Sequence, residues 1–253
     1  MAMTDPLIMV APNGARRGKA DHPALPVTLA ETVAAACACH AAGAAALHLH
    51  VRDAAGGHSL DPGRYREALA ELVRVVPAMR VQITTEAAGR YTVADQHACL
   101  RDLRPGWASV AIREIARDAA LAPGLYALCA DQGIEVQHIL HEAADIVLLT
   151  QWLARGIVPP GPVSVLLVLG RYDPPRAGAP QELAPRLALL PPGARWMVCA
   201  FGAAEHACLR AAARAGGDCR VGFENGLEDA GGRRWADNAA SVAALRASLK
   251  EAA

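Results

Sequence analysis

The segment Leu47–Asp53 reads LHLHVRD and places two histidines in an otherwise apolar run. The stretch Ala46–Val51 therefore predicts a short β-strand. The next stretch, Asp61–Val76, predicts a helix with Pro62 in its first turn. A strand followed directly by a helix is the unit from which parallel α/β folds are built.

The same strand–helix unit repeats along the chain on both sides of this segment. Eight strands are predicted, at Leu7–Ala11, Ala46–Val51, Val81–Thr85, Trp107–Ile112, Glu135–Leu140, Val163–Leu169, Trp196–Ala200 and Arg220–Phe223. Helices are predicted after the capping box of Thr28 and Glu31, and at Asp61–Val76, Val93–Leu103, Ala119–Gln132, Ala143–Arg155, Gln181–Leu190, Ala203–Ala215 and Ala236–Leu249. This alternation indicates βαβ units and a parallel sheet.

Eight such units in 253 residues favour a closed (β/α)8 TIM barrel that occupies residues 1–253 as a single domain. An open, doubly wound sheet is the alternative, although no GxGxxG follows the first strand to indicate a dinucleotide-binding fold. The loop Arg171–Pro180 is the longest irregular piece, and we expect it to form a lid or part of a binding mouth.

Charge and composition limit the classes of partner. The 25 Lys and Arg residues balance the 25 Asp and Glu residues, which argues against nucleic acid or an anionic membrane as the main partner. Seven cysteines without a CxxC pair are expected to be reduced thiols of a cytoplasmic protein. No apolar stretch reaches the ~18 residues that span a bilayer. Because Lys19 and Lys250 are the only lysines, Schiff-base chemistry is disfavoured.

His48 and His50 are the strongest candidates for chemistry. Residues i and i+2 of a strand point to the same face, and the pair lies near the carboxyl end of its strand, where α/β barrels carry their active sites. The imidazole nitrogens need hydrogen-bond partners or a metal, and hydrogen bonding within the barrel top is the alternative. A catalytic zinc often takes two histidines and a carboxylate, and Glu224, just past the eighth strand, is the best third ligand. We predict that these three residues bind zinc or another divalent metal.

Other polar residues, from the predicted strands and from the loops that follow them, are expected to line the same rim. Each is more often structural than catalytic when taken alone, but together they would line a mixed-charge mouth suited to a small oxyacid. They are Asn13, Arg16, Arg52, Asp53, Thr84, Thr85, Glu86, Ser109, Glu135, His138 and Arg171.

Several motifs resemble those of the β-keto acid cleavage enzymes, whose namesake is the 3-keto-5-aminohexanoate cleavage enzyme. The specific motifs are His48-Leu-His-Val-Arg-Asp53 and Arg220-Val-Gly-Phe-Glu-Asn225. The supporting ones are Pro12-Asn-Gly-Ala-Arg16, Leu25-Pro-Val-Thr28, Ile83-Thr-Thr85 and Val168-Leu-Gly170. The resemblance spans almost the whole chain, in order.

This resemblance implies a (β/α)8 barrel that binds zinc and forms a homo-oligomer, a dimer or tetramer. It also implies that a β-keto acid and acetyl-CoA are converted into acetoacetate and a new acyl-CoA. By motif, His48, His50 and Glu224 would bind the metal, and the catalytic positions would be Arg220, Glu135 and Asn225. Substrate contacts would come from Asn13, Thr85, Glu86 and Ser109. The phosphates of CoA need cations, for which the candidates are Arg16, Arg17, Arg90, Arg113 and Arg171.

Asn225 departs from the family pattern. Many members have an aspartate directly after the metal-binding glutamate, and that aspartate acts as the base together with the motif arginine. A neutral amide cannot accept the proton. Either another carboxylate serves, with Glu86, Glu135 and Asp53 as candidates, or the reaction differs.

Three other readings use the same histidine pair. An amidohydrolase-type hydrolase would be expected to have the pair on its first strand and a bridging lysine on a later one. A class II, metal-dependent aldolase would differ in not needing CoA. A non-catalytic metal-binding barrel would be expected to close the coordination of its metal.

Overall fold

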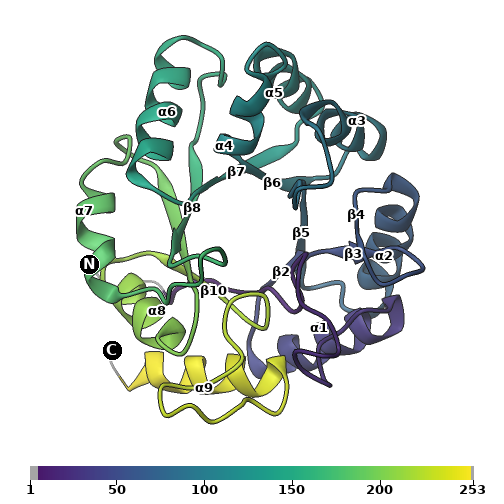
Figure 1. The fold of residues 1–253 in the computed structure, drawn as a ribbon, viewed down its shortest axis with the longest axis vertical. Helices are drawn as coiled ribbons and strands as arrows, with labels where there is room; N and C mark the ends of the chain where they lie inside the picture. Colours follow the sequence, from purple (N-terminus) through teal and green to yellow (C-terminus); the bar gives the residue numbers. More distant parts are fainter. Residues whose placement is uncertain (1–4, 252–253) are drawn as a thin grey trace.

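The computed structural model describes residues 5–251. Eight parallel strands close into a barrel in the order β1-β10-β9-β8-β7-β6-β5-β2, and the helices form a ring around it (Figure 1). Because β1 pairs with both β10 and β2, the sheet has no open edge. The predicted (β/α)8 barrel is confirmed, and the open, doubly wound sheet is wrong.

The elements of the described chain follow the predicted order. The barrel strands are β1 (Ile8–Val10), β2 (Ala46–Leu49), β5 (Arg80–Thr84), β6 (Trp107–Ala111), β7 (Glu135–Leu140), β8 (Ser164–Leu169), β9 (Arg195–Ala200) and β10 (Asp218–Val221). The helices are α1 (Leu29–Ala42), α2 (Pro62–Val75), α3 (Val93–Leu103), α4 (Ile112–Ile115), α5 (Ala122–Asp131), α6 (Ala143–Ala154), α7 (Leu183–Leu187), α8 (Glu205–Arg214) and α9 (Asn238–Lys250). Two 3₁₀ turns, η1 (Ala116–Asp118) and η2 (Pro180–Glu182), precede α5 and α7.

The strand β2 ends earlier than predicted, and a hairpin follows it. Val51–Arg52 forms β3, which pairs antiparallel with β4 (His58–Ser59). Asp53 stabilises the connecting turn, because its Oδ1 accepts hydrogen bonds from the backbone N–H groups of Ala55 and Gly57. The hairpin was not predicted, and it places His58 next to the end of β2.

Two predicted helices are shorter than expected. The helix predicted at Ala119–Gln132 begins at Ala122, with Pro123 in its first turn, where the missing N–H of proline has no cost. The helix predicted at Gln181–Leu190 is reduced to η2 and α7. The capping box of α1 is present: Thr28 Oγ1 accepts from Glu31 N at 3.2 Å, and Glu31 Oε2 accepts from Thr28 N at 3.0 Å.

The buried apolar side chains form two clusters, as expected when strand residues alternate between two faces. The larger cluster lies between the strands and the helices, and it includes Leu47, Leu49 and Ile83. The smaller cluster fills the barrel interior, and it includes Met9 and Leu166. Interior positions near the carboxyl ends of β2, β5 and β10 are polar, and they carry the candidate site. Within residues 5–251, no helix has the length and apolar character required to cross a membrane.

Candidate active site

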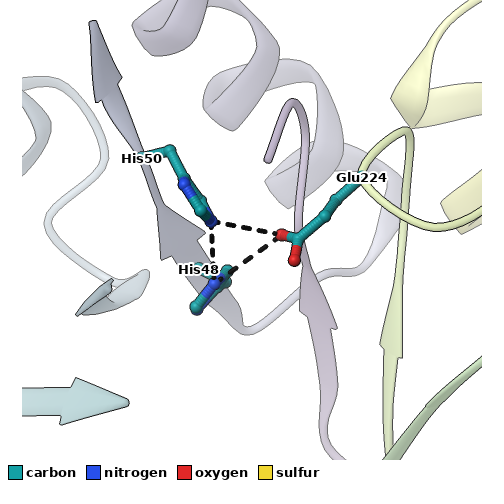
Figure 2. Close-up of side chains that lie close together, drawn as sticks. All are labelled: His48, His50 and Glu224. Carbon is teal, nitrogen blue, oxygen red and sulfur yellow. Dashed lines mark hydrogen bonds and ion pairs between the residues drawn. The ribbon is translucent and has the colours of Figure 1, made fainter. Parts of the chain in front are cut away.

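The structure brings His48, His50 and Glu224 together at the carboxyl rim of the barrel (Figure 2). The Nε2 atoms of the two histidines are 3.2 Å apart. Glu224 Oε2 lies 3.6 Å from His48 Nε2 and 3.5 Å from His50 Nε2. All three residues are buried. The predicted ligand set therefore converges on one point.

These distances fit a tetrahedral metal ion. An ion with bonds of about 2.0–2.1 Å separates its ligand atoms by roughly 3.3–3.4 Å, and the three observed separations bracket that range. Glu224 Oε2 is buried and accepts no hydrogen bond from the described residues. A buried carboxylate oxygen without a donor is costly unless a cation binds it. The three side chains can thus hold a divalent ion.

The backbone around Glu224 is fixed by the neighbouring β1 loop. Glu224 N donates to Ala11 O at 3.0 Å, which ties the turn after β10 to the end of β1. Gly14 in that loop has a φ of +66°, and a Cβ at this position would lie 2.6 Å from Glu224 Cγ. Only glycine fits there without displacing the carboxylate.

Arg220 supports the carboxylate from within the barrel. Its Nη2 donates to Glu224 Oε1 at 3.0 Å and contacts Cys199 Sγ at 3.4 Å, whereas its Nε and Nη1 have no partner among the described residues. Burial alone would raise the pKa of Glu224, but the Arg220 guanidinium outweighs it and holds that pKa well below its usual range. The carboxyl group is therefore ionised and ready to bind a cation.

Each candidate histidine ligand has a polar contact on its far side. His48 Nδ1 lies 2.8 Å from Gln82 Oε1, and His50 Nδ1 lies 3.5 Å from His58 Nδ1. Burial lowers the pKa of His48 to about 3, and Arg220 adds to this shift. Burial likewise lowers the pKa of His58 to about 3, with a further contribution from His50. Both rings are neutral at ordinary pH.

A cavity of about 330 Å³ opens beside the candidate ligands. Its wall contains His48, Glu224 and Arg220, and residues from other rim loops complete it. Those with polar side chains include Arg16, Thr84, Glu86, Arg113, Glu114, His141, Glu142, Arg171, Tyr172 and Arg176. Burial raises the pKa of Glu86, whose carboxylate lies 3.8 Å from Arg16. The mixed charge of this wall suits a small oxyacid.

A second cavity of about 470 Å³ adjoins the first and shares several of its residues. The loop from Arg171 to Pro180, which was expected to be a lid or part of a mouth, contributes to both cavities. Four arginines line the second cavity: Arg16, Arg17, Arg171 and Arg176. Arg90 lies elsewhere, where it pairs with Asp53 at 3.4 Å.

Four of the other predicted site residues are buried near the rim but do not line the main cavity. Asn13 Nδ2 donates to Pro26 O at 3.1 Å, so it holds a loop in place. Thr85 Oγ1 donates to Ser109 O at 2.9 Å, and the threonine that faces the cavity is Thr84. The side chains of Ser109 and Asn225 have no hydrogen-bond partner among the described residues.

The prediction that Glu135 is catalytic is wrong in position. Glu135 is the first residue of β7, so it lies at the amino rim, at the other end of the barrel from the candidate ligands. There it pairs with Arg80 at 3.1 Å and with Arg195 at 3.5 Å. This network at the amino rim joins the first residues of β5, β7 and β9, which are alternate strands of the barrel, and it does not reach the cavity.

Sequence reasoning missed several residues that shape the site. Gln82 has a detectable signal, because it lies two residues before Thr84 and therefore on the same face of its strand. His58 has none, since it comes from an unpredicted hairpin. His141 and Tyr172 line the cavity from loops, and burial lowers the pKa of His141 to about 3. His138, which was expected to line the rim, contacts Tyr126 away from the candidate ligands.

Fold and site together define an enzyme of the (β/α)8-barrel class, since this fold carries its chemistry at the carboxyl rim and the candidate ligands converge there. The chain belongs to the beta-keto acid cleavage enzyme family, whose family model matches residues 6–253. It is 28% identical over 235 residues to a 3-oxoadipate:acetyl-CoA acetyltransferase from Cupriavidus necator, and the alignment covers 89% of this chain and 82% of the relative. The predictions of this family and of an acyltransferase enzyme are confirmed.

Solved structures with lower identity share the fold. The apo structure of ObcA superposes with a TM-score of 0.70 at 18% identity, over 91% of this chain and 62% of that longer chain. A type I 3-dehydroquinate dehydratase from Clostridium difficile gives a TM-score of 0.63 at 9% identity, over 98% of this chain and 92% of that chain. These two likenesses show the barrel architecture alone.

Proposed function

We propose that this enzyme cleaves a β-keto acid in a metal-dependent reaction with acetyl-CoA, giving acetoacetate and a new acyl-CoA. The observation that carries the proposal is the convergence of His48, His50 and Glu224 beside the main cavity, whose wall includes His48 and Glu224, in a chain of this family. Two histidines and a carboxylate with an open side are typical of catalytic zinc, so zinc is the proposed ion. When bound, the ion supplies a Lewis acid that stabilises negative charge on the keto acid.

The reaction balances without a further reactant. A base removes a proton from the carbon between the keto and carboxylate groups, and that carbon attacks the acetyl thioester and releases the CoA thiolate. The thiolate then attacks the original keto carbon and breaks the bond to the central carbon. That carbon regains the proton as acetoacetate leaves, and the acyl group remains on CoA.

Glu86 is the proposed base in place of the family aspartate. It lines the main cavity together with His48 and Glu224, whereas Glu135 lies at the amino rim and Asp53 lies outside the cavity wall. Burial raises the pKa of Glu86, which brings its basicity closer to that of an efficient general base at neutral pH. Arg220 would donate its unpartnered N–H groups to the negative charge that develops on the substrate.

The second cavity is proposed to take the phosphates of acetyl-CoA. Arg16 and Arg171 line both cavities, so a pyrophosphate bound beside them would leave the acyl end able to reach the main cavity. Arginine pairs with phosphate through two parallel hydrogen bonds, which makes it the usual residue for this task. Arg90 is not proposed as a phosphate ligand, because it lines neither cavity and pairs with Asp53 instead.

The position of Arg113 in the main cavity indicates the class of keto acid that the enzyme uses. It lines the main cavity and forms no ion pair or hydrogen bond with the residues that the structure describes. A free cation in that wall would suit a keto acid with a second carboxylate. The curated relative is named for 3-oxoadipate, a compound of this kind.

The direct test offers purified protein a panel of β-keto acids together with acetyl-CoA and measures acetoacetate release. We expect turnover with at least one dicarboxylic member, dependence on acetyl-CoA, and loss of activity after chelation that zinc restores. Cleavage without CoA would favour the aldolase reading, and a metal-loaded protein that turns over no member would contradict the proposal.

Location and assembly belong to the same proposal. All seven cysteines are unpaired, which supports a cytoplasmic enzyme. A homo-oligomer, either a dimer or a tetramer, is proposed from the family resemblance, and light scattering of the purified protein tests it.

A further inference from the structure

The tautomer of His58 is determined by a backbone group. His58 Nε2 lies 2.7 Å from the carbonyl oxygen of Glu86. A carbonyl oxygen can only accept, so Nε2 of His58 must carry the hydrogen. In a neutral imidazole the other nitrogen, Nδ1, is then an acceptor.

This acceptor determines the tautomer of His50. The Nδ1 atoms of His50 and His58 face each other at 3.5 Å. Because His58 Nδ1 carries the lone pair, His50 Nδ1 must carry the hydrogen. His50 Nε2 is therefore left with its lone pair, and this is the atom that faces Glu224 Oε2 and His48 Nε2.

An independent chain of contacts reaches the same result for His48. The side-chain amide nitrogen of Gln82 donates to Gln137 Oε1 at 3.1 Å, which turns the amide oxygen of Gln82 toward His48. That oxygen lies 2.8 Å from His48 Nδ1 and can only accept. His48 Nδ1 therefore carries the hydrogen, and Nε2 has the lone pair. Gln82 and Gln137 are both buried, so water does not compete for these contacts.

The two chains leave two lone pairs and a carboxylate oxygen directed at one point. No hydrogen lies between His48 Nε2 and His50 Nε2, although the atoms are 3.2 Å apart. Such a contact is repulsive until a cation binds between the atoms. We propose that His58 and Gln82 are positioning residues that lock both histidine ligands in the tautomer that binds metal, an inference that rests on the proposed metal dependence. The ion then enters without any proton having to leave an imidazole.

His138 is a buried histidine that neither binds the proposed metal nor positions one of its ligands. It lies on β7, is buried like the two ligands, and places Nδ1 3.4 Å from the hydroxyl of Tyr126. Neither contact chain passes through it. His138→Phe is therefore a control matched for residue type and burial.

The first experiment reads the tautomers in metal-free protein. Two-bond ¹H–¹⁵N correlation of protein labelled with ¹⁵N-histidine distinguishes Nδ1–H from Nε2–H rings, and single histidine variants assign the signals. We expect Nε2–H for His58 and Nδ1–H for both His48 and His50. An Nε2–H tautomer at either ligand would overturn the inference.

The second experiment measures zinc affinity by competition with a chromophoric chelator. We expect His58→Phe and Gln82→Met to weaken zinc binding about 10- to 100-fold, the usual effect of removing a partner behind a metal ligand. Gln82→Glu keeps an acceptor facing His48 and should restore most of the affinity, whereas His138→Phe should leave it unchanged. Unchanged affinity in both His58→Phe and Gln82→Met would overturn the inference. If a variant does not fold, the tautomers of the wild-type protein decide.

Neither experiment uses a keto acid or acetyl-CoA, so the two proposals can fail separately. Correct tautomers and tight zinc binding without turnover would contradict the proposed reaction alone. Turnover in a protein whose ligand rings carry hydrogen on Nε2 would contradict the positioning role alone.

Discussion

Arg220 and Glu224 lie four residues apart at the end of β10 and form a buried ion pair of 3.0 Å through Oε1 of the glutamate. The pair uses one oxygen of Glu224 and leaves Oε2 facing the two histidines. One turn of the chain thus carries both a candidate metal ligand and the cation that keeps this ligand ionised.

Loss of Arg220 should damage both the site and the fold. Arg220→Met removes one partner of a buried pair, which costs about 3–5 kcal/mol of stability in general. It also removes the donors proposed to stabilise developing charge, whose loss lowers kcat by about 10²–10³. Thermal unfolding and steady-state kinetics on the metal-loaded protein measure the two effects. Arg195→Met at the amino rim is the control, and equal kcat values for the two variants would argue against the catalytic role.

His48→Ala should abolish metal binding. The wild-type protein is expected to contain about one divalent ion per chain by elemental analysis, and the variant should contain almost none, because two of three ligands rarely hold a catalytic ion. His40→Ala, on α1, serves as the matched variant outside the site. Equal metal content in the wild type and His48→Ala would refute the ligand assignment.

Glu86→Gln should lower kcat by about 10²–10⁴, the usual contribution of a general base, while metal content stays the same. Asp53→Asn and Glu135→Gln change the other two carboxylates once considered for this role, and both should leave kcat close to that of the wild type. A larger loss in either of them than in Glu86→Gln would reassign the base.

The pH dependence of the reaction should reflect the environment of Glu86. The base must be ionised, and burial raises its pKa above the ordinary glutamate value. Activity should therefore be full on the alkaline side and fall as the pH drops through the raised pKa, at a higher pH than an exposed glutamate would give. The acid limb of a kcat/KM profile measures this, and a limb at or below the ordinary glutamate pKa would count against Glu86.

Arg171→Ala should raise KM for acetyl-CoA about tenfold and KM for the keto acid by less, because the side chain lines both cavities but is proposed to bind the phosphates. Arg90→Ala removes a cation of the same type outside the second cavity and should alter neither constant. The assignment fails if the two variants have the same effect, or if Arg171→Ala changes only the KM for the keto acid.

Much of the fold could be predicted from the sequence, because each βα unit carries its own alternation of apolar strand and capped helix. The candidate ligands could also be predicted from the sequence, since the spacing of His48 and His50 fixes a shared face and Glu224 follows a strand at the same rim. The choice of Thr85 over Thr84 failed because one residue at a strand end decides which face a side chain occupies.

Other parts of the site depend on contacts that no local pattern encodes. His58 reaches His50 only because an irregular hairpin folds back over the end of β2. Glu135 was misplaced because motif resemblance outweighed its position as the first residue of a parallel strand, where a side chain belongs to the amino rim. The arginines of the second cavity come from two loops far apart in sequence, Arg16 and Arg17 from one and Arg171 and Arg176 from the other.

The ion pairs of Glu135 with Arg80 and Arg195 have a consequence for how this enzyme can change over time. They connect strands at the end of the barrel where no candidate ligand lies. Substitutions that strengthen the barrel can therefore accumulate at that end without altering the chemistry. The loops at the other rim can then change in sequence and accept new keto acids, while residues at the amino rim maintain the stability of the barrel.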